Sequence, residues 1–193
     1  MCRNKVAGLY GRVPGRRKVV RAGLPRSFTD PWAAWLATVL PASRERLGEE
    51  WRAAWNEAPI WRFSLPAGVC GPNSVLGLWM PSEDRAGRPF PLTCACLGPA
   101  DLGCGVTTFL PAAEEVALAA IRADLSPEGV EERLVSTVGN CGSASPSPLR
   151  AALWWTDGAQ RRPALGLALP GLPEAATFAT MLVQSARRSP SRS

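Results

Sequence analysis

The sequence contains no histidine, only one tyrosine, and no apolar run long enough to cross a membrane. The absence of histidine excludes Ser-His-Asp and Cys-His nucleophilic catalysis and metal sites with imidazole ligands. A membrane-spanning helix needs about 18 or more apolar residues in succession, so none is predicted. No secretory leader is recognisable at residues 1–3, and we therefore expect a cytoplasmic protein with reduced cysteines.

The charge is distributed unevenly along the 193 residues, although the formal net charge is +6. Residues 1–26 hold eight Lys and Arg and no acidic residue, and residues 186–193 hold three Arg. Residues 27–185 carry eleven basic and sixteen acidic residues, so the body of the chain is mildly acidic. Length and composition predict one globular domain over residues 1–186 and a disordered basic tail over residues 187–193.

Apolar periodicity predicts an α+β fold, an α/β sandwich with a largely antiparallel central sheet flanked by helices. Thr29 or Asp30 can cap the first helix, Pro31 suits its first turn, and Pro41 is expected to kink or restart it. Strands are predicted at residues 5–10, 60–65, 75–80, 90–97, 149–156 and 163–169, and helices at residues 29–58, 112–124, 127–138 (capped by Ser126) and 173–186.

Eight tryptophans are many for this length, and core packing is the simplest use for them. Trp154 and Trp155 are adjacent in a predicted strand, so their side chains point to opposite faces of the sheet. Either both faces are covered or one of these rings lies on a contact surface. The remaining tryptophans fall on predicted helices and strands: Trp32, Trp35, Trp51, Trp55, Trp61 and Trp79.

The cysteines do not form a convincing reactive or metal-binding motif. Cys94, Cys96 and Cys104 have neither a Cys-x-x-Cys spacing nor an evident fourth ligand, so we expect buried thiols and no metal. Cys70, before Gly71, remains a possible nucleophile, although no activating base is evident. A small cytosolic hydrolase or transferase that uses Cys70 or a carboxylate is therefore kept as an alternative.

The basic first 26 residues permit two kinds of partner. They could bind nucleic acid, but Tyr10 is their only aromatic residue and no helix-turn-helix pattern is present. An acidic protein partner fits equally well. Residues 11–18 do not match a nucleotide-binding Walker motif.

Residues 82–88 are predicted to form an exposed but ordered charged turn. Asp84 can accept hydrogen bonds from its own turn and can pair with Arg85 or Arg88. Such a turn is a candidate contact surface.

Several motifs together resemble the TagF (ImpM) family of type VI secretion accessory proteins, in the same order and over nearly the whole chain. They are Gly8-Leu-Tyr-Gly-Arg-Val-Pro14, Arg21-Ala-Gly-Leu-Pro-Arg-Ser-Phe28, Asp30-Pro-Trp-Ala-Ala-Trp-Leu36, Ala58-Pro-Ile-Trp-Arg-Phe63, Gly68-Val-Cys-Gly71, Met80-Pro-Ser-Glu-Asp-Arg-Ala-Gly-Arg88, Phe90-Pro-Leu92 and Leu153-Trp-Trp-Thr-Asp-Gly158.

The resemblance implies a cytoplasmic, non-enzymatic regulator that represses type VI secretion after translation, in concert with the forkhead-associated scaffold Fha. It implies no cofactor, no metal, no nucleic acid and no membrane insertion, and a fold similar to longin-type SNARE domains. The residues that it marks as candidate motif or partner-binding positions are Tyr10, Gly11, Pro14, Arg21, Gly23, Leu24, Pro25, Trp61, Asp84, Arg85, Gly87 and Arg88.

The chain departs from the family pattern at two places. Arg17 and Lys18 stand where the family usually has Gly-Asp, and Ala33 stands where it favours Asp. Both departures remove negative charge near the N-terminal motif. If those carboxylates contact a partner, we expect weaker repression or a changed partner.

Overall fold

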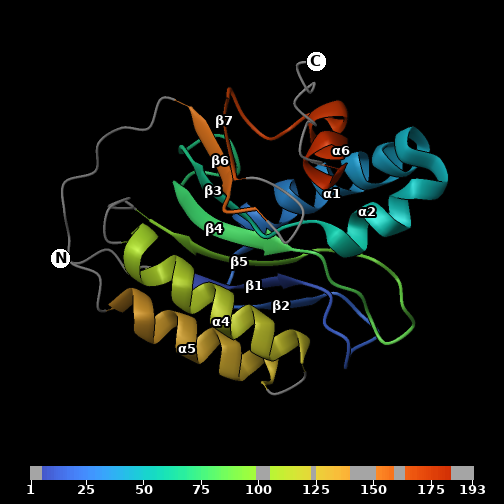
Figure 1. Cartoon of the computed structure of the whole chain (residues 1–193). Coiled ribbons are helices and arrows are strands. Elements are labelled where there is room, and N and C mark those ends of the chain that lie inside the picture. The colour runs from blue at the N-terminus through green and yellow to red at the C-terminus, as the bar shows by residue number, and fades with distance from the viewer. Residues whose placement is uncertain (1–5, 99–104, 123–124, 140–150, 159–163, 184–193) are drawn as a thin grey trace, which may run out of the picture.

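The computed structural model describes residues 6–98, 105–122, 125–139, 151–158 and 164–183. They form one seven-stranded sheet in the order β2-β1-β5-β4-β3-β6-β7, and every pairing between neighbouring strands is antiparallel. Helices pack on both faces (Figure 1), which confirms the predicted α+β sandwich.

The elements follow the apolar pattern of the sequence closely. The strands are β1 (Val6–Gly11), β2 (Val20–Ala22), β3 (Trp61–Leu65), β4 (Val75–Met80), β5 (Leu92–Leu97), β6 (Ala152–Thr156) and β7 (Leu165–Leu169). The helices are α1 (Arg26–Leu47), α2 (Trp51–Glu57), α4 (Leu110–Ile121), α5 (Pro127–Gly139) and α6 (Ala175–Val183), with a 3-10 turn at Gly48–Glu50 and a π-helical turn at Gly105–Phe109.

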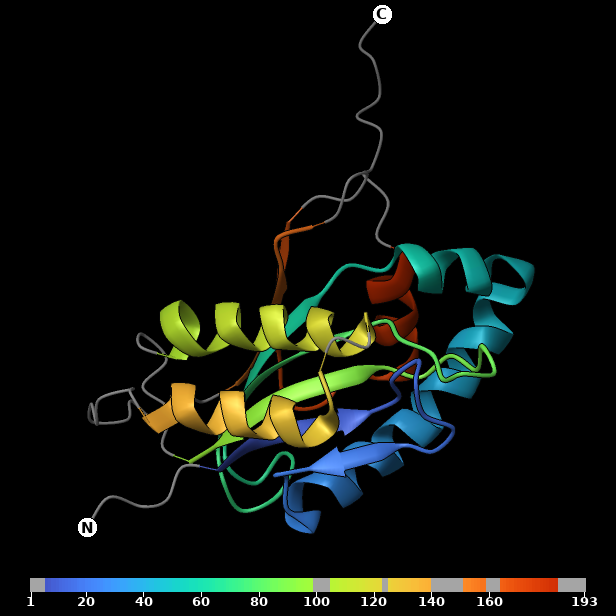
Figure 2. The ribbon, with the colours of Figure 1, turned by 90° about the horizontal axis from the view of Figure 1, so that it is seen from below.

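The two faces of the sheet are covered by different helices, as Figures 1 and 2 show. Helices α1, α2 and α6 pack together on one face, whereas α4 lies against β4 and β5 and α5 against β1 and β2 on the other. Trp154 and Trp155 point to these opposite faces, as the sequence predicts: Trp154 is buried under α1, and Trp155 is half-buried on the α4 side.

The face under α1, α2 and α6, here called the aromatic face, is built from large rings. Trp32 stacks or tilts against Phe28, Trp35, Phe63 and Trp154, with ring centroids 4.7–6.2 Å apart. The other tryptophan side chains that pack on this face are Trp51, Trp55, Trp61 and Trp79. Offset and tilted rings add attraction beyond the burial of their area, so this face is a dense aromatic layer.

The opposite face, here called the aliphatic face, is filled mainly by smaller side chains. Alanines at 113, 117 and 120 bring α4 close to the sheet, and leucines and valines fill the space between. Ala113 and Ala117 are completely buried. Small residues allow two elements to approach closely, so the layer contains few large rings, among them Phe109 and the half-buried Trp155.

The start of α1 corrects one prediction. The helix begins at Arg26, because Pro25 has an extended backbone (φ −75°, ψ 156°) and its carbonyl oxygen accepts the N–H groups of Phe28 and Thr29. Thr29 is thus buried inside the first turn and caps nothing, and Pro31 lies beyond that turn. The predicted cap at Thr29 or Asp30 is wrong, since it rested on residue preference alone.

Proline 41 does not break the helix, which continues through it to Leu47. The interruption falls at Gly48, whose positive φ of 54° favours glycine, and a 3-10 turn then leads into α2. The N-cap of α5 is confirmed, because the Ser126 hydroxyl accepts the Gly129 N–H at 3.2 Å. The predicted tail at residues 187–193 lies outside the described residues.

Candidate functional site

The sequence-predicted positions fall into three places in the fold. Tyr10, Gly11 and Pro14 lie at the end of β1 and in the loop of residues 12–19, here called the basic loop. Four others belong to residues 82–88, here called the Asp84 turn: Asp84, Arg85, Gly87 and Arg88. Between β2 and α1 lie Arg21, Gly23, Leu24 and Pro25, whereas Trp61 is in the core.

Asp84 is the centre of its turn. Its Oδ1 accepts the backbone N–H groups of Ala86 at 2.9 Å and Arg88 at 3.1 Å. Its Oδ2 accepts the Arg88 Nε at 2.7 Å and the Arg12 Nη1 at 2.6 Å. One carboxylate thus closes the turn and joins it to the basic loop.

The burial of Asp84 corrects the expectation of an exposed turn. Asp84 is only 2% exposed, whereas Arg85 and Arg88 are exposed. Burial opposes ionisation of Asp84, but hydrogen bonds from Arg88 and Ala86 and the positive charge of Arg12 outweigh it, so the pKa of Asp84 is lowered. The carboxylate therefore stays charged and holds both loops at neutral pH.

Further contacts tie the basic loop to the Asp84 turn. The Ser82 hydroxyl donates to the Arg12 carbonyl oxygen at 2.7 Å, and the Arg12 guanidinium lies 5.7 Å from the centre of the Phe90 ring. Tyr10 packs edge-on against the same ring, with centroids 6.1 Å apart. Arg12, Ser82 and Phe90 are not among the sequence-predicted positions, because their partners lie about 70 to 80 positions away in the chain.

The Asp84 turn also holds the backbone of the basic loop. The Arg85 N–H donates to the Arg16 carbonyl oxygen at 3.3 Å, and the Arg88 Nη2 donates to the Arg17 carbonyl oxygen at 3.0 Å. These bonds use the backbone of the basic loop and leave the side chains of Arg16, Arg17 and Lys18 exposed to solvent.

Helix α2 contributes one more link, through Arg52. Its Nη2 lies 2.6 Å from the Glu83 Oε2, and its Nη1 donates to the Gly87 carbonyl oxygen at 3.3 Å. Both side chains of this ion pair are nearly half exposed, so the pair contributes at most about 1 kcal/mol. It positions the tip of the turn beside α2.

Gly23, Leu24 and Pro25, in the connection between β2 and α1, serve the fold itself and are not placed on a contact surface. Gly23 has a φ of 72°, and a Cβ there would collide with the Ala7 carbonyl oxygen, so only glycine fits. Leu24 is buried in the core and Pro25 begins the helix boundary, whereas Arg21 is exposed beside Tyr10 in the paired strand.

Trp61 is fully buried, and its indole N–H donates to the Met181 carbonyl oxygen at 3.2 Å. The structure therefore places Trp61 in the core and not on a contact surface. Trp61 therefore belongs to the sequence motif because it packs in the core of the aromatic face.

The thiols are poor nucleophile candidates. Cys70 is 1% exposed, and burial raises its pKa to about 12, as burial also does for Cys94. The Cys70 Sγ donates to the Phe28 carbonyl oxygen at 3.6 Å. Cys70 therefore gives no support to the hydrolase or transferase alternative, which also allowed a carboxylate. Within the described residues, no three His, Cys, Asp or Glu side chains cluster as metal ligands.

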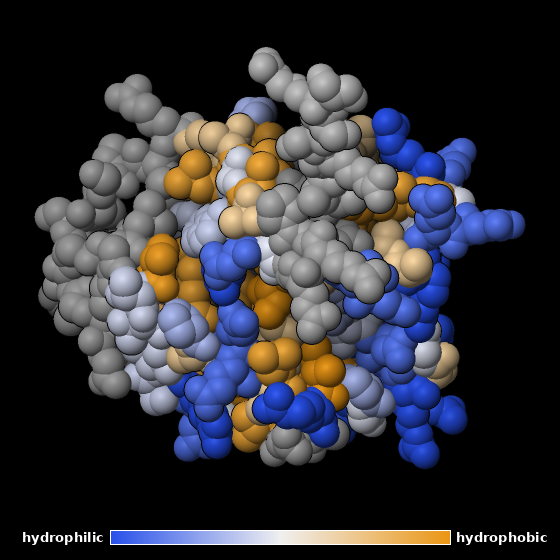
Figure 3. All heavy atoms as spheres, in the orientation of Figure 1, coloured by the Kyte–Doolittle hydropathy of each residue, from blue (hydrophilic) through white to orange (hydrophobic). Residues whose placement is uncertain are grey.

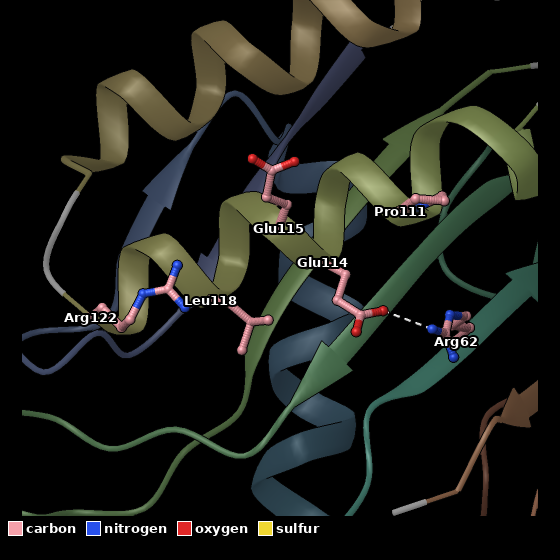
Figure 4. A pocket seen from close by; sticks show the side chains of 6 residues that line it. All are labelled: Arg62, Pro111, Glu114, Glu115, Leu118 and Arg122. Carbon is pink, nitrogen blue, oxygen red and sulfur yellow. Dashed lines mark hydrogen bonds and ion pairs between the residues drawn. The ribbon is translucent and has the colours of Figure 1, made fainter.

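A depression of about 500 Å³ lies between α4 and β3 (Figure 4). Its polar centre is Arg62, whose guanidinium lies 2.7 Å from both Glu114 on α4 and Asp157 after β6. Glu114 extends from α4 toward Arg62, whereas Glu115, which also lines the depression, points away from Arg62. Because two carboxylates already neutralise Arg62, this guanidinium is not available to an anionic ligand.

Hydrophilic residues gather along the right-hand side of the surface in Figure 3, where Figure 1 places α2 and the connections after β1 and β4. The fold and this cluster of loops define an α+β sandwich that presents, at one end, a preformed polar surface fixed by a buried carboxylate. In the described part of the chain, no helix is long and apolar enough to span a membrane.

Comparison with known proteins identifies the family. Residues 8–137 match the model of the TagF N-terminal domain, described as type VI secretion system-associated, and the chain belongs to this family. The crystal structure of PA0076 from Pseudomonas aeruginosa PAO1 is similar, with 32% sequence identity and a TM-score of 0.74 over 95% of this chain and 97% of that one. Comparison with curated proteins gives no match.

Proposed function

We propose that this type VI secretion-associated protein represses secretion in the cytoplasm by binding another protein, the forkhead-associated scaffold. The single observation that carries the proposal is family membership over residues 8–137. The architecture supports binding as the mode of action, because the loops are fixed before any partner arrives. Preformed loops lose less conformational entropy on association.

The loops that we propose as the contact surface are the basic loop and the Asp84 turn. Asp84, Gly87 and the backbone of Arg88 shape the turn, and the exposed Arg85 side chain is available to a partner. Gly11 belongs to this group for a structural reason: a Cβ there would collide with the Pro91 carbonyl oxygen.

The experiment that tests repression compares deletion, wild-type and overproducing strains for export of the secreted tube protein. A repressor that occupies a scaffold acts by mass action, so export should rise on deletion and fall with overproduction. The amounts of the secretion components inside the cells should stay unchanged. Unchanged export in all three strains would contradict the proposal.

A variant of the Asp84 turn connects this test to the structure. Arg85→Glu should leave the melting temperature within about 2 °C, because the side chain is exposed, but should weaken repression on overproduction. Arg133→Glu, at an exposed position on α5, is the matched charge-reversal control and should repress like the wild type. A lower melting temperature with full repression would make the turn purely structural.

A further inference from the structure

The basic loop presents cations that the fold itself does not neutralise. Arg16, Arg17 and Lys18 are exposed in succession, and Arg85 of the Asp84 turn is exposed beside them. Within the described ranges, the side chains of Arg17, Lys18 and Arg85 make no ion pair. Arg16 is partly balanced by Glu128, whose pKa is lowered chiefly by hydrogen bonds from its own backbone N–H and from Ser126, with a smaller contribution from the Arg16 charge.

The backbone that carries these cations is fixed by hydrogen bonds, although the cationic side chains themselves are exposed. The Arg16 N–H donates to the Val13 carbonyl oxygen at 3.0 Å, and the carbonyl oxygens of Arg16 and Arg17 are bound by the Asp84 turn. The loop backbone is therefore fixed from both sides. A partner that binds here has to order only the ends of the side chains, which favours affinity.

A groove of about 400 Å³ runs between the basic loop and the start of α5. Arg16, Arg17 and Lys18 line one wall, and Pro127 and Glu128 line the other. Its floor is apolar, because valines 19 and 20 also line it, and the first of them is 37% exposed. The groove thus offers positive charge together with a small apolar contact.

The surroundings favour a short acidic peptide over a nucleic acid. Glu128 lines the wall opposite the cations and would repel a phosphate backbone that ran along the groove, whereas a short peptide can keep its carboxylates on the basic wall. No aromatic side chain in the described part of the chain is exposed for base stacking. A few carboxylates with a small apolar side chain match both the charge and the floor.

We propose that the groove beside the basic loop binds a short, carboxylate-rich segment of a partner protein, with Arg17 and Lys18 facing its carboxylates and Arg85 available to the segment where it leaves the groove. This inference deepens the proposed function, on which it rests for the existence of a protein partner. It adds the chemistry of the partner's contacting segment and the cations that face it.

The test measures binding of a fluorescent oligo-glutamate peptide to the full chain by anisotropy, with an oligo-glutamine peptide of equal length for comparison. The double variant Arg17→Glu/Lys18→Glu should bind the oligo-glutamate peptide about tenfold or more weakly than the wild type. The affinity of the wild type should fall as salt rises, because exposed charges are screened.

A matched control separates local contacts from net charge. Arg46→Glu/Arg133→Glu reverses two exposed cations elsewhere, and each double variant lowers the formal net charge from +6 to +2 because each reversal removes two charges. The control should bind within about twofold of the wild type. An equal loss in both double variants would overturn the proposal, as would tighter wild-type binding to duplex DNA or phosphatidylserine vesicles than to the peptide.

Binding of the purified scaffold distinguishes this inference from the proposed function. Scaffold binding that survives Arg17→Glu/Lys18→Glu overturns the inference and leaves repression intact. Peptide binding that depends on these cations, with no scaffold binding and unchanged secretion, supports the groove and contradicts the proposed function.

Discussion

The two faces of the sheet reach burial by different means. On the aromatic face, bulky indoles carry N–H groups, and four tryptophans donate theirs: Trp32 to Thr93, Trp35 to Pro173, Trp51 to Ser43 and Trp61 to Met181. Among the described residues, the buried indole N–H groups of Trp79 and Trp154 have no acceptor. The aliphatic face needs no such partners, because alanines, valines and leucines pack without polar atoms. Aromatic packing thus ties distant segments together through directed bonds, whereas aliphatic packing depends on close approach alone.

The largest expected effect comes from removing the central ring of the aromatic face. Trp32→Ala removes contacts with four rings and a 3.1 Å hydrogen bond to the Thr93 hydroxyl, so we expect a loss of about 4–5 kcal/mol in the free energy of unfolding. Leu134→Ala, at a fully buried position on the aliphatic face, should lose about 2–4 kcal/mol. Urea denaturation measures both, and a larger loss for Leu134→Ala would contradict the comparison.

A smaller loss in the free energy of unfolding should appear at low pH, and it should come from the basic loop and the Asp84 turn. Among the described residues, Asp84 is the only buried ionisable carboxylate, and neither face contains one. Its pKa is lowered below the ordinary value of 3.8, so its contribution to stability is complete above that value and is lost as the pH falls through the folded pKa.

The free energy of unfolding of the wild type should therefore fall more steeply than that of Asp84→Asn as the pH is lowered below about 4. Glu115→Gln, which removes an exposed carboxylate from α4, is the control and should retain the acid dependence of the wild type. Parallel pH profiles for the wild type and Asp84→Asn would show that the buried carboxylate does not stabilise the loops.

The smallest expected effect is the reactivity of one buried thiol on each face, which should be essentially zero in the folded protein. Cys70 is in the aromatic face and Cys94 in the aliphatic face, and burial raises the pKa of both to about 12. Neither should react with iodoacetamide at pH 8 in the folded protein. In urea both should become reactive at the same midpoint, as peptide mass spectrometry can show. Earlier reaction of Cys94 would mean that the aliphatic face opens separately.

The sequence predicts the elements far better than their junctions. Period-two and helical patterns locate six of the seven strands and most helices, because burial of alternate or periodic side chains is a local property; the three-residue β2 is too short to carry such a pattern. The start of α1 is missed because Pro25, not a polar cap, sets the boundary. The π-helical turn at Gly105–Phe109 is missed as well, since no local pattern in the sequence marks it.

The candidate site is predicted only in part for a related reason. The hydrogen bonds that Asp84 accepts from Ala86 and Arg88 are local, and spacing alone suggests them. The ion pair with Arg12 joins residues 72 positions apart, and only the fold brings them together. Trp61 is the opposite case: the sequence marks it as a candidate contact residue, but it is buried and serves core packing.

The hydrogen bonds that shape the basic loop have an evolutionary consequence. Donors from outside the loop, the Arg85 N–H, the Arg88 guanidinium and the Ser82 hydroxyl, hold it by its carbonyl groups, which every amino acid possesses. Mutations at Arg17 or Lys18 therefore change the chemistry of the surface without changing the path of the backbone. The charge of this surface can thus change while the fold that carries it stays the same.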